Sequence, residues 1–321
     1  MSKLYIIGNG FDLAHELDTS YWDFRDFLEE HDSDFLLEFE KLYSIYYLDN
    51  TEYGYSAEAQ TKWNDRIYNT LWCEFEKNMG FPDTQDMLEL SNSVLDNMDL
   101  ETGNIGIIDT MDEYWRKQYG FINKLQKYVK EWISQIDLSE IKPRKKTLIE
   151  NIDDYFFNFN YTRLLEDVYQ IEKIVHIHGS IGKDAESSPF MGHCNQKEID
   201  KHWQCAEDAT KAGNEGETSI HNAIAEYLTA IYKDTSHYIW ENNYFFNKLK
   251  SVDEVIIIGW SAGEVDLPYL RKIRDSVNKK TKWLAYYYDD TAYNSLKNAF
   301  LQASITNCFQ TEFIQSNNFW D

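Results

Sequence analysis

The sequence predicts an α/β protein in which a doubly wound parallel sheet carries large helical insertions. Short apolar runs of the kind that form buried strands occur near the start, the middle and the end of the chain. Segments suited to helices follow these runs, and this alternation is typical of a parallel sheet covered by helices. Two long stretches carry apolar residues at three- and four-residue spacing instead, which indicates added helices.

Five strands are expected in the sheet. In chain order they are Lys3–Gly8, Tyr155–Asn160, Lys173–His178, Glu254–Gly259 and Lys282–Tyr288. Helices, with some turn in the first, are expected over about Asp12–Glu30, 162–170, Asp266–Val277 and Thr291–Ala303. Within the first of these, Ser20 and Asp23 are spaced as a capping box that would restart a helix.

The strands and the inserted helices together predict one discontinuous domain over residues 1–321. Its Rossmann-like core is expected to cover approximately 1–30, 151–195 and 251–321, with helical insertions over 31–150 and 196–250. In the first insertion, one helical face is expected to carry Leu71, Trp72, Phe75 and Met79. In the second, residues 207–216 are expected to form a mobile loop.

The charge of the chain argues against one class of partner. It has 31 basic and 55 acidic residues, for a net charge of −24, and so acidic a surface repels nucleic-acid backbones. We therefore expect no non-specific binding of DNA or RNA. A small anionic ligand remains compatible with this charge where backbone N–H groups point at it.

The cysteines and the apolar runs indicate a cytoplasmic protein. The four cysteines include no C-x-x-C pair, so a disulfide framework is not expected. The apolar run Leu4–Ile7 is too short for a signal peptide, and no run of about 18 apolar residues predicts a membrane span.

The first candidate motif is Gly8-Asn9-Gly10-Phe11-Asp12, directly after the first expected strand. Glycines at this point let the backbone turn sharply and approach a phosphate. Leu13 stands where a full dinucleotide fingerprint has its third glycine, so the motif is incomplete. A simple turn from strand to helix is the alternative interpretation.

Polar residues also follow two middle strands. Asn158 and Asn160 share one face of their strand, and either binds a ligand or caps the next helix. His176 and His178 share a face of the next strand, and Gly179 ends it. Since open α/β sheets bind ligands at the carboxyl ends of their strands, His178 is the better ligand candidate, whereas His176 suits a hydrogen-bonded, partly buried position.

The histidines and cysteines further along do not predict a metal site. Their spacing matches no standard zinc pattern, so no metal is expected at His193, Cys194, His202 and Cys205.

The fourth motif follows the strongest expected strand and reads Gly259-Trp260-Ser261-Ala262-Gly263, with Asp266 nearby. Ser261 and the glycine amides could bind phosphate, and Asp266 could bind a ribose hydroxyl or cap a helix. The string also has the form of a nucleophile elbow, G-x-S-x-G. That interpretation fails because a histidine must follow the serine, and residues 262–321 contain none.

Taken together, these motifs resemble those of bacterial AbiH-type abortive-infection proteins. The resemblance rests on IIGNGFDLAHELDTSYWDF at Ile6–Phe24 and on FNFNYTRLLE, VHIHGSI, PFMGHC and IIIGWSAGEVDLPYL, in that order. That family is in turn similar to the sirtuin-like Rossmann superfamily, which binds NAD. The resemblance thus implies a sirtuin-like fold with NAD as substrate or ligand.

Carried over by position, the resemblance makes Asn160 and His178 the catalytic pair. The nucleotide-binding residues would be Gly8, Asn9, Gly10, Phe11, Asp12, Gly179, Gly259, Ser261 and Asp266. Trp260 and Thr162 depart from the polar or acidic residues of many relatives, and the C-x-x-C zinc ribbon of deacetylating sirtuins is missing. The missing zinc ribbon puts protein deacetylation in doubt.

The implied activity is NAD glycohydrolysis in anti-phage defence, which yields nicotinamide and ADP-ribose. The alternatives are a non-enzymatic sensor of NAD or ADP-ribose and an ADP-ribosyltransferase. Because an enzyme that destroys NAD is toxic to its own cell, we expect the helical insertions or a homo-oligomer to hold it inactive. No motif in the sequence identifies the phage component that would activate the protein.

Overall fold

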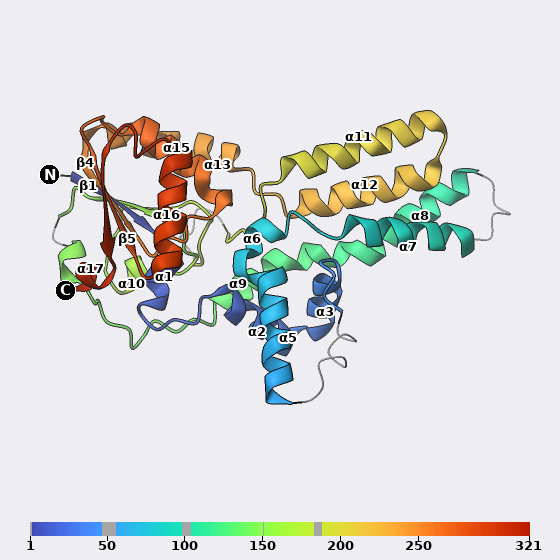
Figure 1. Ribbon diagram of the computed structural model, residues 1–321, viewed down its shortest axis with the longest axis horizontal. Helices are drawn as coiled ribbons and strands as arrows, with labels where there is room; N and C mark the ends of the chain where they lie inside the picture. The colour runs from blue at the N-terminus through green and yellow to red at the C-terminus, as the bar shows by residue number, and fades with distance from the viewer. Residues whose placement is uncertain (1, 47–55, 98–103, 150, 183–187) are drawn as a thin grey trace. The chain divides into compact units, whose positions relative to one another are not determined.

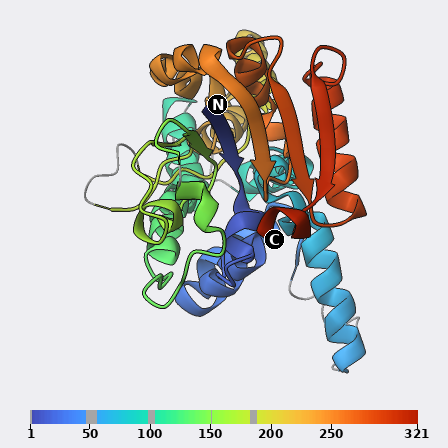
Figure 2. The same cartoon turned by 90° about the vertical axis from the view of Figure 1, so that its left-hand side faces the viewer.

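A computed structural model describes residues 2–46, 56–97, 104–149, 151–182 and 188–321. Six parallel strands form one sheet in the order β3-β2-β1-β4-β5-β6. The strands are β1 (Ser2–Ile7), β2 (Tyr155–Asn158), β3 (Ile174–His176), β4 (Val252–Ile258), β5 (Lys282–Tyr287) and β6 (Gln310–Gln315). Figure 2 shows β1, in dark blue, beside β4 and the orange-to-red strands that follow. The predicted α/β fold with a parallel sheet is confirmed.

The order of the strands reverses between β1 and β4. Ile7, the last residue of β1, pairs with Asn158 of β2 on one side and with Ile258 of β4 on the other. In open parallel sheets, ligands bind outside the carboxyl ends of the strands at such a reversal. The loops that start at Gly8, Phe159 and Gly259 therefore meet at the edge of the sheet where a ligand is expected.

Alternate residues of the strands fill two cores, one on each face of the sheet. One core packs Leu4, Ile6 and Ile257 against α15 (Leu267–Ser276) and α16 (Asp290–Gln302) (Figure 1). The other packs Tyr5, Ile7 and Ile258 against α1 (Asn9–Leu13), α10 (Leu164–Asp167) and α17 (Asn317–Trp320). Burial on both faces explains why the central strands are almost continuously apolar.

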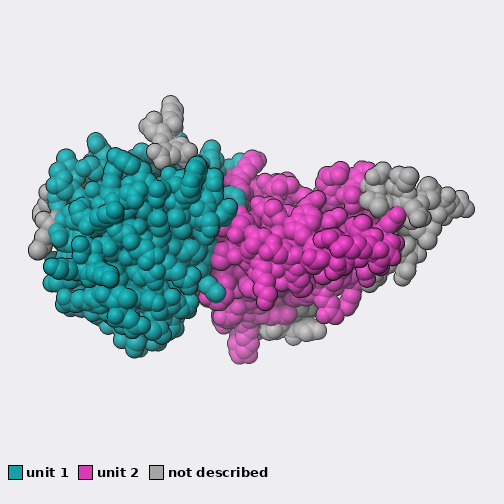
Figure 3. Space-filling model, turned by 90° about the horizontal axis from the view of Figure 1, so that it is seen from above, with its two compact units in different colours: residues 1–23, 129–190, 234–321 teal, residues 24–128, 191–233 magenta. Residues whose placement is uncertain are grey.

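The chain divides into two compact units, coloured separately in Figure 3. Unit 1 comprises residues 1–23, 129–190 and 234–321 and holds the sheet, while unit 2 comprises 24–128 and 191–233. Besides the helices already named, unit 1 contains α13 (Thr235–Glu241) and α14 (Asn243–Lys248). Unit 2 contains α3 (Ser33–Lys41), α5 (Ala57–Thr70), α6 (Phe75–Asn78), α7 (Thr84–Asn97), α8 (Asn104–Tyr119), α11 (Gln196–Ala212) and α12 (Glu215–Ala230). Helices α2 (Tyr21–His31) and α9 (Leu125–Ile133) each cross a boundary of these ranges.

Two details of the helical stretches correct the expectations. Residues 207–216 are not a mobile loop but the end of α11 and the start of α12. Gly213, at φ +73°, closes the first helix, and the side chain of Asn214 accepts a hydrogen bond from the Glu217 amide to begin the second. The residues Leu71, Trp72, Phe75 and Met79 are all buried, but they do not share one helix, because α5 ends at Thr70 and a short 3-10 turn follows.

The capping box at Ser20 is confirmed. The hydroxyl of Ser20 accepts a hydrogen bond from the Asp23 amide, and the Asp23 carboxylate accepts from the Ser20 amide. These contacts cap the start of α2, which follows the chain segment that carries the first motif.

Candidate functional site

The glycine-rich loop after β1 packs directly on the loop after β4. The amide of Gly8 donates to the Ile258 carbonyl over 3.1 Å, and the amide of Gly10 donates to the Gly259 carbonyl over 2.7 Å. A Cβ atom on Gly259 would lie 2.2 Å from the Phe11 nitrogen, and Gly259 has a φ of +68°. Only glycine allows this approach of two backbones. The glycines thus join the two loops, and their contact with a phosphate stays a prediction.

The side chains of Asn9 and Phe11 stabilise the same loop through contacts with other parts of unit 1. The side-chain nitrogen of Asn9 donates to the Thr19 carbonyl over 2.8 Å. The ring of Phe11 is fully buried and lies 5.6 Å from the Tyr169 ring and 5.3 Å from the Trp320 ring. Both side chains are therefore engaged within unit 1 rather than turned toward solvent.

Asp12 points into the protein and binds two residues of the loop after β2. Its carboxylate accepts a 2.7 Å hydrogen bond from the Asn160 side-chain nitrogen and a 2.6 Å bond from the Thr162 hydroxyl. Burial, opposed by these two bonds, raises the pKa of the Asp12 carboxyl to about 7. The Asp12 side chain is 1% exposed, so its carboxylate contacts Asn160 and Thr162 rather than solvent.

The amide of Asn160 is held by its nitrogen only. Besides Asp12, that nitrogen donates to the Gly8 carbonyl over 3.2 Å, and the backbone amide of Asn160 donates to the Asn158 side chain over 3.1 Å. The side-chain oxygen of Asn160 is buried and has no hydrogen-bond partner in the described part of the chain. A buried acceptor left unpaired costs roughly 1–3 kcal/mol. Such an acceptor is a natural place for a donor group of a ligand.

His178 lies in a ring of aromatic side chains beside Asp266. Its Nε2 atom is 3.3 Å from a carboxylate oxygen of Asp266. The imidazole centre is 5.3 Å from the Phe159 ring, 6.3 Å from the Tyr161 ring and 5.7 Å from the Tyr269 ring. This aromatic wall limits how the imidazole can turn.

The residue after His178 fixes the backbone of that segment. Gly179 has a φ of +78°, and a Cβ atom there would lie 2.2 Å from the Ser188 carbonyl oxygen. The Phe190 amide donates to the His178 carbonyl over 2.9 Å. Gly179 thus orients the histidine by allowing a tight turn.

Asp266 connects His178 to the loop after β4. Its second carboxylate oxygen accepts a 3.2 Å hydrogen bond from the Trp260 indole nitrogen. The Trp260 ring also stacks on the Phe159 ring, with centroids 5.6 Å apart. In the same loop Ser261 is exposed, and Ala262 adopts a φ of +58°, which is strained for a residue other than glycine.

The comparison with protein families identifies the group to which the chain belongs. Residues 4–287 match the family described as bacteriophage abortive infection AbiH. This protein is a member of the AbiH family. No curated protein and no solved structure matches the chain. Among the described residues, no helix is long and apolar enough to cross a membrane.

In this AbiH-family chain, unit 1 brings the predicted residues together in two groups. One group joins the two glycine loops with Asp12 and Asn160, and the other joins His178 with Gly179 and Asp266. Within the described residues, no hydrogen bond links Asn160 directly to His178, although Phe159, the residue before Asn160, contacts the imidazole.

Two residues of the AbiH-family site escaped the sequence analysis. Glu166 lies 3.0 Å from His176, whose other ring nitrogen is 3.1 Å from the Asn160 carbonyl oxygen. Thr162 was noticed only as a departure from the family pattern, yet it donates to Asp12. Polar residues in FNFNYTRLLE, directly after a buried strand, were the available signal. Their partners could not be inferred, because Thr162 and Asp12 are 150 positions apart.

The two histidines His193 and His202 have different hydrogen-bond partners. The ring of His193 is buried and its Nε2 atom lies 3.0 Å from the Leu228 carbonyl oxygen. His202 instead faces His221, with their Nδ1 atoms 2.9 Å apart. Burial lowers the pKa of each of these two residues, His193 and His202, to about 4.

Proposed function

We propose that this AbiH-family protein acts in anti-phage abortive infection by hydrolysing NAD to nicotinamide and ADP-ribose. The observation that carries the proposal is the side-chain oxygen of Asn160, buried and unpaired at the edge of the sheet where a ligand is expected. A ribose hydroxyl or a water molecule is a donor that would satisfy this oxygen.

The topology supports a nucleotide as the ligand. The strand order 3-2-1-4-5-6 is that of the Rossmann dinucleotide-binding folds, in which the ligand lies at the reversal of strand order. A sirtuin-like relationship is part of the proposal. In such a relationship the loops after β1 and β4 hold the nucleotide, and Ser261 is an exposed hydroxyl on the second of these loops.

The leaving group of this reaction departs without protonation by a strong general acid. Cleavage of the bond between nicotinamide and ribose passes through an oxocarbenium-like state, and nicotinamide leaves as a neutral molecule. Asn160 would orient the attacking water or a ribose hydroxyl through its side-chain oxygen. His178 would take the proton from the water that attacks the anomeric carbon, and the carboxylate of Asp266 would stabilise the imidazolium that forms. Each role contributes about 2–4 kcal/mol to lowering the barrier.

The first experiment incubates the purified full chain with NAD and separates the products by chromatography. We expect the wild type to release nicotinamide and ADP-ribose, at a basal rate as long as the helical insertions or a homo-oligomer hold the enzyme inactive. The variants Asn160→Ala and His178→Ala should reduce the rate by roughly 10² to 10³-fold. The control His237→Ala changes an exposed histidine of unit 1 and should keep the wild-type rate. Folded Asn160→Ala and His178→Ala proteins with near-normal turnover would refute the assignment.

The burial of both candidate catalytic residues suits a second function, that of a nucleotide sensor, as well as it suits an inactive enzyme. Asn160 is 5% exposed and His178 is 4% exposed, so a substrate reaches them only after the surrounding loops move. A sensor, or an enzyme held inactive until phage infection, has this property. Product analysis separates the functions: an intact nucleotide indicates sensing, free ADP-ribose hydrolysis, and a modified acceptor ADP-ribosyl transfer.

A further inference from the structure

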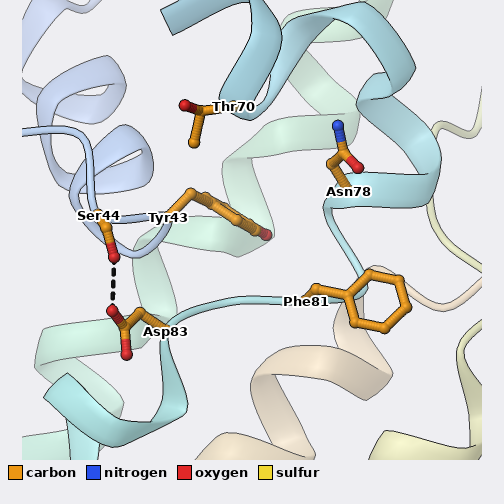
Figure 4. Close-up of a pocket in the computed structure, with 6 residues that line it drawn as sticks. All are labelled: Tyr43, Ser44, Thr70, Asn78, Phe81 and Asp83. Carbon is orange, nitrogen blue, oxygen red and sulfur yellow. Dashed lines mark hydrogen bonds between the residues drawn. The ribbon is translucent and has the colours of Figure 1, made fainter. Parts of the chain in front are cut away.

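A small pocket in unit 2 has a charged wall residue whose hydrogen bonds are already made. Its walls are Tyr43, Ser44, Thr70, Asn78, Phe81 and Asp83 (Figure 4). The carboxylate of Asp83 accepts hydrogen bonds from the Ser44 hydroxyl and from the Asp86 amide at the start of α7. Hydrogen-bonding groups without a partner lie instead in unit 1, along one edge of the sheet.

Strand β6 ends the sheet with a long unpaired edge. It pairs in parallel with β5 on one side, and no strand of the described chain lies on its other side. The strand at the opposite end of the sheet, β3, has three residues, whereas β6 has six (Figure 2). A long unpaired strand is a template on which another strand can pair.

The hydrogen bonds to β5 determine which backbone groups of β6 point outward. The Ser316 amide donates to the Tyr287 carbonyl over 2.8 Å, so the backbone groups of the even-numbered residues face β5. Because neighbouring residues of a strand alternate in direction, the N–H and C=O groups of Thr311, Phe313 and Gln315 point away from the sheet. In the described part of the chain, these outward groups have no hydrogen-bond partner.

The sequence of β6 lacks the features that usually protect an exposed edge. The strand contains no proline and no lysine, and it pairs with β5 without a bulge. Its one charged residue is Glu312. Apolar side chains next to β6 are also exposed: Leu301 follows Phe300, which packs at 5.1 Å on Phe313, and is 60% exposed. Tyr288, directly after β5, is 79% exposed. These features indicate an edge that another chain covers.

We propose that β6 pairs antiparallel with β6 of a second copy of this chain, across a two-fold axis at Phe313. In this register Phe313 faces its symmetry mate, and Thr311 faces the partner subunit's Gln315. All the outward N–H groups of both strands then donate to outward C=O groups of the other strand. Glu312 faces the partner subunit's Ile314, so no two carboxylates stand opposite each other.

The sequence of β6 favours this register over its neighbours. A shift of two residues in one direction would set Glu312 against its symmetry mate, which is unfavourable for like charges. A shift in the other direction would bring Thr311 opposite Asn317, which already belongs to α17. The strand thus fits a copy of itself, and a two-fold interface uses each favourable contact twice. The facing Phe313 rings add a cross-strand aromatic pair.

Sedimentation velocity of the full chain, over about 1 to 100 μM protein, tests the proposal. We expect a reversible dimer that becomes more stable at higher salt, because salt screens the repulsion between two copies that each carry a charge of −24. Thr311→Pro removes an outward N–H group but no hydrogen bond to β5, so it should weaken the dimer roughly 10- to 100-fold. The matched control Thr311→Val keeps that N–H group and should dimerise as the wild type does.

Substitutions at the partly buried Ile314 test the register and cover the case in which Thr311→Pro does not fold. Ile314→Glu places a carboxylate opposite the partner subunit's Glu312, and Ile314→Lys places an ammonium there. The lysine variant should therefore dimerise several-fold more tightly than the glutamate variant. A chain that stays monomeric at about 100 μM leaves the edge to a different partner and overturns the proposal. Equal dimerisation of Ile314→Glu and Ile314→Lys, or of folded Thr311→Pro and Thr311→Val, overturns it as well.

Discussion

Asp12 fixes the orientation of Asn160, since its carboxylate lies 2.7 Å from the Asn160 side-chain nitrogen across 148 residues of sequence. If that nitrogen were exchanged with the oxygen, the Asn160 oxygen would face two acceptors, the Asp12 carboxyl oxygen and the Gly8 carbonyl. Asp12 therefore determines that the oxygen of Asn160, and not its nitrogen, is left for a ligand. In the proposed reaction Asp12 is a positioning residue.

The substitution Asp12→Asn should reduce NAD turnover by about tenfold or more, because a neutral amide no longer fixes the orientation of Asn160. The substitution should lower kcat more than it changes KM. Steady-state kinetics measures it, with Asp18→Asn as the control at an exposed position nearby. An unchanged rate in a folded Asp12→Asn protein would show that Asn160 is oriented by other contacts.

The raised pKa of Asp12 predicts how stability changes with pH. Between its ordinary value of 3.8 and about 7, the folded chain keeps a proton that the unfolded chain has lost. The stabilising contribution is complete below pH 3.8, decreases as the pH rises toward about 7, and is constant above it. Urea unfolding of wild type and Asp12→Asn from pH 5 to pH 8 should show the difference in free energy falling with pH. A difference that stays constant from pH 5 to pH 8 would mean that Asp12 is already ionised in the folded state.

Gly259→Ala should separate the two glycine loops. The new methyl group would meet the Phe11 nitrogen, and a φ of +68° is unfavourable for alanine, so we expect destabilisation of at least about 2 kcal/mol. Gly120→Ala is the control, because nothing lies within 4 Å of a Cβ atom there. Equal unfolding midpoints for the two variants would contradict this account of the loops.

Trp260→Phe tests the support of Asp266. Phenylalanine keeps the stacking on Phe159 but removes the indole donor to the Asp266 carboxylate. We expect turnover to fall roughly tenfold or more while the protein stays folded, since a hydrogen bond to a charged group contributes about 1.5–3 kcal/mol. Trp240→Phe, at a side chain that is 74% exposed, should have no effect. Equal turnover in both variants would mean that Asp266 does not depend on Trp260.

The strands buried on both faces were predictable from sequence, and β6, at one of the two edges of the sheet, was not. Runs such as EVIIIG are apolar at every position because β4 lies between two neighbours and two cores. Strand β6, with the sequence QTEFIQ, has one neighbour and partly exposed side chains, so it carries no continuous apolar run. The error at residues 207–216 has a different cause, since a glycine and an asparagine that cap two helices were interpreted as a loop.

For the candidate site, the sequence located the polar residues but not their partners. The ends of strands placed Asn160 and His178 at the carboxyl edge of the sheet, because strand ends are local features. The contact between Asp12 and Asn160 depends on the pairing of β1 with β2, which no local pattern encodes. Burial of the Asn160 oxygen likewise follows from the packing of distant loops.

The position of β1 between β2 and β4 also sets when a newly made chain can acquire the site. Of the six strands β1 is synthesised first, yet its two neighbours begin at Tyr155 and Val252. Closing contacts over such sequence separations is slow, and here it also has to wait for synthesis. Until Gly259 and Asp266 have emerged, a growing chain has neither the partner of the first glycine loop nor the carboxylate beside His178. Nascent chains that stop short of this point are therefore harmless if the complete site consumes NAD.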